Sequence, residues 1–388
     1  MRRTVGWKWV SLMLGLSACG GRYDIGSGEG GAAGAAGDES EEGVGGSSVG
    51  NSGGKGATVG SGGSSIGSGG SGIAGGNSAS AGSGGADVYA YPCVYPEPPS
   101  GFAEPAVAWA RMSTFLFDEV RPPLEPLPEQ TTLAWAQSQL DLVIDGIPGD
   151  GDVPAGLDAL LRRWAFSDIE GSEEAANQWS NQLFLGSVAV SLFAGGGPNE
   201  RTSFLAEPSF LRAHPSAAQR GTWIAKEALC EEIGLPPVSD VTLPVPGPGE
   251  TLRQALSAAT SAPACAGCHS LVNPLGFAFS HYDAAGEYQE TENGLPIDAS
   301  GTHNGNSFSW EFDGLGELNS LLAYSEEVTH CVPRRLLGNA IEEVRGDGFE
   351  SPNFSAEADY VVCEVVNSYR SARKMVRAIA SSPSILGQ

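Results

Sequence analysis

Residues 20–86 consist mostly of Gly, Ser and Ala, and this segment limits how much of the chain can fold. It shows no apolar periodicity, and it contains a small acidic patch at 38–42. Such a composition buries too little apolar surface to offset the entropy lost on folding, so we expect a disordered linker over 19–86. Its r.m.s. span is expected to be about 45 Å, from the square-root scaling of flexible Gly/Ser-rich linkers. A folded body is therefore expected from residue 87 onward.

The N-terminus has the features of a bacterial export signal. Basic residues at positions 2, 3 and 8 precede an apolar stretch over 9–16, which is too short to span a bilayer. The Leu16-Ser17-Ala18-Cys19 sequence resembles the lipobox of bacterial lipoproteins. The resemblance implies removal of a signal peptide over 1–18 and attachment of lipid to Cys19; the alternative is an ordinary signal peptide with an incidental cysteine. Gly20 in place of Asp favours the outer membrane, so we expect a lipid-anchored protein of the cell envelope.

The charge balance of the chain is strongly acidic. It has 21 Lys and Arg against 46 Asp and Glu, a formal net charge of −25. This charge repels the phosphates of nucleic acids, so nucleic-acid binding is disfavoured. It suits a basic partner protein, or it serves solubility alone, which is the simpler interpretation.

Helical patterns dominate the sequence after residue 87. Apolar residues recur at helical spacing over 157–164, 336–344 and 362–369. Thr251 followed by Gln254 is typical of a capping box at the start of a helix. Alternating, strand-like stretches are few, and proline-rich runs indicate loops. The sequence predicts a mainly α fold, a multi-helix body with a loop-rich central segment.

The Cys265-Ala266-Gly267-Cys268-His269 sequence is the most specific chemical motif in the chain. Each thiol can add to a vinyl group of haem, and the adjacent His269 can then bind the iron as the proximal ligand. A thioredoxin-like redox pair normally opens a helix within a βαβ unit, which the pattern lacks. A zinc site needs a second Cys/His pair at suitable spacing, which is not found. The motif therefore predicts covalently bound haem c.

The residues around the iron are less well defined by the sequence. Pro274 lies in a Pro-Leu segment that resembles the one after the haem motif of small cytochromes c, where the proline carbonyl accepts a hydrogen bond from the proximal histidine. An ordinary helix-ending turn is the alternative. For the sixth ligand, Met375 lies far downstream and Met112 sits on an apolar helix face that suits the core. His281 is the leading candidate distal ligand, ahead of His303 and His330, and an open or water-bound position is equally plausible.

Seven cysteines are present, and three of them are assigned to lipid and haem: Cys19, Cys265 and Cys268. The remaining four, Cys93, Cys230, Cys331 and Cys363, form an even set, which usually pairs in an oxidising compartment. Cys331 and Cys363 lie on adjacent predicted helices. A disulfide between them is plausible and leaves Cys93 with Cys230, although three connectivities are possible.

Several segments after residue 106 resemble one known family in their order along the chain. They lie at 110–116, 215–221, 228–230, 265–269, 273–277, 282–286, 297–301, 331–338 and 381–383. In this order they are similar to the planctomycete-type multi-domain cytochrome c proteins. The resemblance implies a helical domain over 87–205, a haem-bearing domain over 206–320 and a C-terminal helical domain over 321–388. Asn273 stands where the family has Asp, and Ser280 replaces an acidic residue, so charge near the iron could differ.

Electron transfer at the cell envelope is the leading functional hypothesis. A lipid-anchored c-type haem protein would pass single electrons to a redox partner protein. The alternatives are a haem peroxidase or oxidase with an open distal site, and a haem-free surface-binding module with structural cysteines. The sequence does not decide whether the protein is an enzyme.

Overall fold

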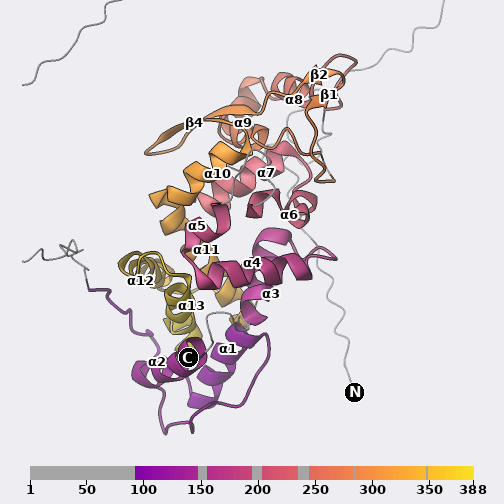
Figure 1. Cartoon of the computed structure of the whole chain (residues 1–388). Coiled ribbons are helices and arrows are strands. Elements are labelled where there is room, and N and C mark those ends of the chain that lie inside the picture. Colours follow the sequence, from indigo (N-terminus) through magenta and orange to yellow (C-terminus); the bar gives the residue numbers. More distant parts are fainter. Residues whose placement is uncertain (1–91, 147–154, 195–202, 235–243, 284, 347) are drawn as a thin grey trace, which may run out of the picture. The chain divides into compact units, whose positions relative to one another are not determined.

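The computed structural model describes residues 92–146, 155–194, 203–234, 244–283, 285–346 and 348–388. The expected signal peptide over 1–18, the lipid-bearing Cys19 and the linker over 19–86 lie outside the described residues. The described chain is mainly helical, which confirms the predicted fold class (Figure 1). The part from Ala90 onward belongs to one compact unit.

The N-terminal half contains the helices α1 Pro105–Phe117, α2 Leu133–Leu140, η1 Asp141–Asp145, α3 Ala155–Phe166, α4 Glu173–Leu185, α5 Val188–Phe193, η2 Phe204–Ala206, α6 Pro208–Ala213, α7 Ala217–Trp223 and η3 Ile224–Ala228. The C-terminal half contains α8 Leu252–Ala259, α9 Pro263–Phe277, α10 Leu315–Tyr324, α11 Glu326–Arg345, α12 Phe354–Asn367, α13 Ala372–Ala380 and α14 Pro383–Leu386. Two antiparallel hairpins lie between α9 and α10: β1 Thr291–Glu292 with β2 Leu295–Pro296, and β3 Ser300–Asn304 with β4 Ser309–Asp313.

Two of the predicted helical faces are confirmed and one is wrong. The apolar faces over 157–164 and 336–344 lie in α3 and α11 and are largely buried. The pattern over 362–369 does not mark the buried face, because α12 ends at Asn367 and Tyr369 lies beyond it with a φ of 56° and 86% exposure. The core is instead contacted by Ala358, Val361 and Val365. The buried face of α12 is therefore displaced by one residue from the face that the pattern over 362–369 predicted.

An aromatic cluster joins the helices on both sides of residue 206. The ring of Phe204 lies within 6.5 Å of six other aromatic rings, those of Trp164, Phe166, Trp179, Phe193, Phe210 and Trp223. These rings come from α3, α4, α5, α6 and α7. The same apolar core continues through α11, α12 and α13. The division at residues 205 and 320 stays a prediction.

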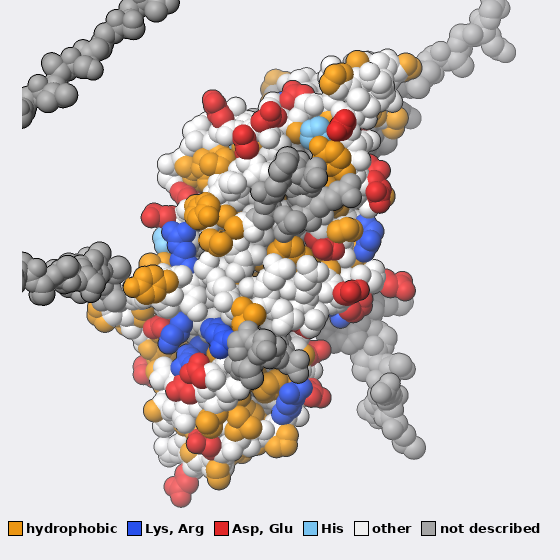
Figure 2. Space-filling model, viewed as in Figure 1, with side chains coloured by type: hydrophobic (Ala, Val, Ile, Leu, Met, Phe, Trp, Pro, Cys, Tyr) orange, Lys and Arg blue, Asp and Glu red, His pale blue; other side chains and the backbone are white. Residues whose placement is uncertain are grey.

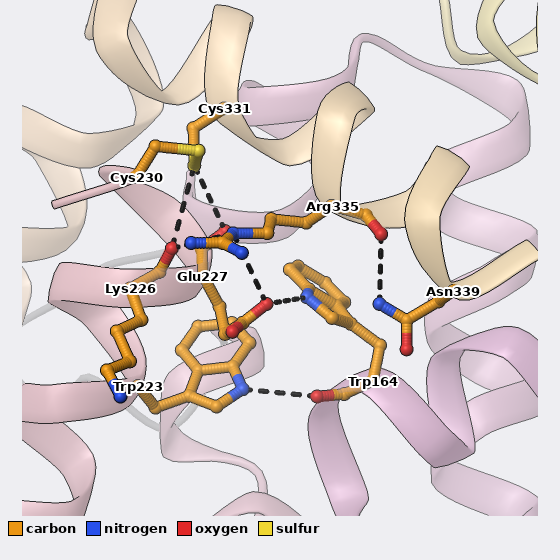
Figure 3. A network of polar contacts seen from close by, with 8 residues as sticks. All are labelled: Trp164, Trp223, Lys226, Glu227, Cys230, Cys331, Arg335 and Asn339. Atoms are coloured by element: carbon orange, nitrogen blue, oxygen red, sulfur yellow. Dashed lines mark hydrogen bonds and ion pairs between the residues drawn. A yellow bond between two sulfur atoms is a disulfide. The ribbon is translucent and has the colours of Figure 1, made fainter. Parts of the chain in front are cut away.

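A network of polar contacts holds η3 between α3 and α11 (Figure 3). The indole nitrogen of Trp164 donates to Glu227 at 3.0 Å, and the indole nitrogen of Trp223 donates to the carbonyl of Trp164 at 3.2 Å. The Nε of Arg335 donates to the carbonyl of Lys226 at 2.9 Å. These bonds satisfy polar groups that the surrounding aromatic rings would otherwise leave without partners.

The four cysteines predicted to form disulfides do so, but the favoured pairing is wrong. The disulfides join Cys93 to Cys363 and Cys230 to Cys331, with Cα–Cα distances of 5.6 and 5.4 Å. Cys331 lies in α11, which packs on η3, and Cys230 lies two residues after the end of η3 (Figure 3). Adjacent helices therefore do not pair their cysteines here, because the faces that carry them contact other elements.

Helices α7 and α9 lie side by side (Figure 1). Glycines on both helices allow the close approach. A Cβ built on Gly221 would lie 1.9 Å from the carbonyl oxygen of Val272. A Cβ built on Gly276 would lie 2.0 Å from the carbonyl oxygen of Ala217. Neither position has room for a side chain. The two glycines therefore set the distance at which α7 supports the helix that carries the Cys-X-X-Cys-His motif.

Strand β3 crosses α9 on another side. A Cβ built on Gly301 would lie 2.8 Å from the carbonyl oxygen of Pro274. The Nδ1 of His303 lies 3.1 Å from the carbonyl oxygen of Leu271. Pro274 cannot donate a backbone hydrogen bond within α9, and His303 supplies a donor to the turn just before it. The hairpin thus fixes the middle of the motif-bearing helix.

Candidate functional site

The three chemical groups of the motif lie within little more than one turn of a single helix, α9. Pro263 occupies the first turn, where its missing N–H costs no helical hydrogen bond. Cys268 and His269 follow Cys265 by three and four residues, spacings that place side chains on one helical face. Cys265 and His269 are each 7% exposed, whereas Cys268 is half-buried and has a free thiol. Cys265 and His269 therefore face the protein interior, Cys265 takes part in a disulfide, and the thiol of Cys268 is partly accessible.

Buried polar side chains hold His269 in place. The Nδ1 of His269 lies 2.9 Å from the Oδ1 of Asn273, one helical turn further along. The Nδ2 of Asn273 donates to the Oγ1 of Thr260 at 2.9 Å, and that hydroxyl donates to the carbonyl of Leu256 at 2.8 Å. The side chains of His269, Asn273 and Thr260 are all buried. The chain of contacts connects the imidazole to the C-terminal turn of α8.

The partner of His269 differs from the one that the sequence suggested. The candidate was the carbonyl of Pro274, which here faces Gly301 of β3. The contact is made by Asn273, the preceding residue. Its position four residues after the histidine, on the same helical face, is the sequence signal that could have identified it.

The surface around the motif has room and little charge. A Cβ built on Gly267 would meet no atom within 4 Å. Residues 254–282 contain no Asp, Glu, Lys or Arg, although the whole chain carries 67 charged residues as 21 basic and 46 acidic. Ala264, Gly267 and Ser270 are exposed on α9. The exposed positions of α9 are therefore small and uncharged, while Cys265 and His269 lie on its buried side.

The other histidines have different surroundings. His303 is fully buried, with Nδ1 near the carbonyl of Leu271 and Nε2 3.0 Å from a carboxylate oxygen of Glu231. The Nδ1 of His281 lies 2.8 Å from the carbonyl oxygen of Gln289, and the imidazole stacks on the ring of Tyr288. His330 is exposed on α11. The role of His281 as a distal ligand stays a prediction, while His303 has both ring nitrogens engaged.

The two methionines considered as iron ligands lie in the core. Met112 in α1 and Met375 in α13 each have no exposed surface. The sequence assigned Met112 to the core, and its burial confirms this. Within the described ranges, no group of three or more His, Cys, Asp and Glu side chains is arranged to hold a metal ion.

Arg220 is a buried residue that the sequence reasoning missed. Its guanidinium donates to the carbonyls of His214, Tyr282 and Asp283 at 2.8 to 3.0 Å. Burial lowers the pKa of Arg220 to about 10. The side chain holds the loop after α9 against α7. Arg220 also lines a cavity of about 250 Å³, together with Arg253 and Phe277.

The chain therefore belongs to a class of mainly helical proteins that carry a Cys-X-X-Cys-His motif on a helix. In this chain that helix, α9, packs against α7 through glycine contacts. Residues 200–292 match the family described as "PSCyt3: Protein of unknown function (DUF1588)". The match covers 93 of the 388 residues, and it agrees with the resemblance seen in the sequence. The matched segment includes α7 and α9.

Comparison with curated proteins and with solved structures finds no match to this chain. Among the residues that the structure describes, no helix is both long and apolar enough to cross a membrane.

Proposed function

We propose that the protein is an exported c-type haem protein that transfers single electrons at the cell envelope. The observation that carries the proposal is the arrangement on α9. Two cysteines and a histidine lie on one helical face, and a buried amide holds the imidazole. An imidazole oriented by a second buried group is the usual arrangement of a histidine that binds a metal.

Attachment of haem uses the thiols of Cys265 and Cys268. Each cysteine would hold the group by adding its S–H bond across a vinyl double bond, with sulfur bonded to one carbon and hydrogen to the other. The addition changes no oxidation state overall, and it requires both cysteines to be reduced when it occurs. When bound, haem supplies a one-electron iron couple, whose potential depends on its ligands and on nearby hydrogen bonds.

The residues of the chain have distinct tasks in this proposal. Cys265 and Cys268 anchor the group, and His269 offers Nε2 to the iron. Asn273 orients the imidazole from its Nδ1 side. The close contact between α7 and α9 keeps the helix in place while charge changes beside it.

A haem peroxidase or oxidase is the second candidate, and the surroundings of three side chains favour it. His303 has both ring nitrogens in hydrogen bonds, and Met112 and Met375 are packed in the core. None of these three side chains is placed to bind iron without repacking. If His281 does not reach the iron either, the sixth position is open to small ligands.

The envelope location and the partner are parts of the same proposal. Lipid on Cys19 and the linker over 19–86 would tether the folded part to a membrane. Acidic side chains are spread over the face shown in Figure 2, with Lys and Arg among them. A chain with a net charge of −25 favours a basic redox partner, and their association should weaken as salt is added.

Haem staining of a denaturing gel tests the proposal. The full chain is produced in a host that attaches haem to a control c-type protein, together with Cys268→Ala and the matched surface variant Ser270→Ala. We expect stain in the wild type and in Ser270→Ala, and a loss of stable attachment in Cys268→Ala. Absence of stain in the wild type would leave a haem-free binding module as the remaining explanation.

Carbon monoxide separates the two haem functions. A reduced protein with a bound sixth ligand should bind CO slowly, as expected for an electron carrier. Rapid CO binding points to an open site and to peroxidase or oxidase chemistry. His281→Ala should alter the oxidised spectrum only if His281 is the sixth ligand.

A further inference from the structure

The hydrogen bonds behind His269 determine which of its nitrogens carries the proton. The carbonyl oxygen of Leu256 can only accept hydrogen bonds. The hydroxyl of Thr260 lies 2.8 Å from this oxygen and has one hydrogen, which it must donate there. Towards Asn273, 2.9 Å away, the oxygen of Thr260 can therefore only accept.

This constraint passes through the amide of Asn273. The atom that faces Thr260 must be the NH₂ group, because the threonine oxygen accepts. The amide carbonyl then faces Nδ1 of His269 at 2.9 Å. A carbonyl can only accept, so Nδ1 must carry a hydrogen. In the neutral imidazole Nε2 is then unprotonated, with its lone pair available.

We infer that Thr260 and Asn273 are positioning residues that hold neutral His269 in the Nδ1–H form and so prepare Nε2 to bind the iron. The inference rests on the proposed haem function for its purpose, although the proton position follows from the hydrogen bonds alone. All three side chains are buried, so water does not compete with these contacts.

The chemical nature of the partner also matters for the iron. Asn273 is neutral, whereas a carboxylate at this place would draw the Nδ1 proton more strongly and make the imidazole a better electron donor. A better donor stabilises the oxidised iron. The amide therefore sets a higher reduction potential than a carboxylate would, and Asn273→Asp should lower it.

The proton position is tested on the full chain without haem, made in a host that lacks c-type maturation. Nitrogen-15 NMR of the histidine rings, at a pH where imidazole is neutral, distinguishes protonated from unprotonated ring nitrogens. The signals of His269 are assigned by their absence in His269→Gln. We expect a protonated Nδ1 and an unprotonated Nε2. A predominant Nε2–H form in the wild type overturns the inference.

Two variants test the role of Thr260. Thr260→Val removes the hydroxyl at nearly constant volume, and Thr260→Ser keeps it. We expect a mixture of both tautomers in Thr260→Val and the wild-type form in Thr260→Ser. A pure Nδ1–H form in both variants would show that Thr260 does not position the amide, and would overturn the role assigned to Thr260. Circular dichroism of both variants establishes that the fold is retained.

The haem-loaded protein provides a second readout, the midpoint potential. Asn273→Asp should have a lower potential than the wild type, and an unchanged or higher potential contradicts the inference. The failure of the haem proposal can be distinguished from the failure of the His269 positioning proposal. A negative haem stain with an Nδ1–H histidine removes the haem function and leaves the positioning intact. A positive stain with an Nε2–H histidine in the haem-free chain does the reverse.

Discussion

Two glycines on α9 should respond in opposite ways to the same substitution. Gly276 packs against α7, and a Cβ there would lie 2.0 Å from the carbonyl oxygen of Ala217, whereas ordinary contacts begin at 3.4 Å. The clash is with backbone, so it can be relieved only by moving one helix from the other. At Gly267 a Cβ would meet nothing within 4 Å.

The magnitudes follow from these surroundings. Alanine stabilises a helix interior relative to glycine by roughly 0.5–1 kcal/mol, and Gly267→Ala should gain up to this amount. Gly276→Ala makes the same local gain but overpacks the α7–α9 contact, at a cost of about 1–3 kcal/mol or more. We therefore expect Gly276→Ala to be less stable than Gly267→Ala by at least about 1–3 kcal/mol.

Urea unfolding followed by circular dichroism measures the difference. Both variants are compared with the wild type in the same haem state, and equal slopes of the transitions confirm that their midpoints can be compared. If both variants shift the midpoint in the same direction and by the same amount, α7 and α9 do not touch as described. The interpretation of Gly276 as a close-contact residue would then be refuted.

Other predictions concern stability and its dependence on pH. Replacing Cys230 and Cys331 together by Ala should cost roughly 2–5 kcal/mol, because the disulfide closes a loop with a sequence separation of 101 residues; an unchanged urea midpoint contradicts this. Glu231→Leu removes the acceptor for buried His303 and should cost about 1–3 kcal/mol, measured in the same way against Glu232→Leu at an exposed position. Burial lowers the pKa of His214 to about 4, below the usual 6.5, so the unfolded state binds more protons between these values. Stability should therefore fall as pH drops from 6.5 towards 4, by up to roughly 3 kcal/mol from this group, and His214→Gln should flatten that slope in urea midpoints measured from pH 4 to pH 7.5.

Local signals in the sequence were sufficient for several elements. The capping box at Thr251 and Gln254 forms as predicted, since both partners lie within one turn. Pro263 at the start of α9 is a signal of the same local kind. A buried face was identified correctly in α3 and α11, where large apolar side chains recur at helical spacing.

Features that depend on distant segments were not predictable in this way. The partner of Cys331 is set by the packing of α11 on η3, which no spacing between cysteines encodes. The pairing of Glu231 with His303 joins residues 72 positions apart in the chain. In α12 the predicted face failed because Tyr369 lies after the helix, in a turn with positive φ.

The candidate site was predicted in part for the same reason. The cysteines and His269 were identified because their chemistry follows from spacing along one helix. Asn273 was noticed only as a departure from a family pattern, and its contact with His269 needed the helical geometry. The contribution of Thr260 comes from α8 and has no signal near the motif.

Mass spectrometry of a proteolytic peptide that spans residues 265–269 tests the central claim most directly. The full chain is expressed where a control c-type protein acquires haem, and the peptide is analysed under denaturing conditions. We predict a peptide that carries the mass of one haem, with both Cys265 and Cys268 blocked to alkylation. A peptide without haem, whose two cysteines alkylate after reduction, would contradict the account.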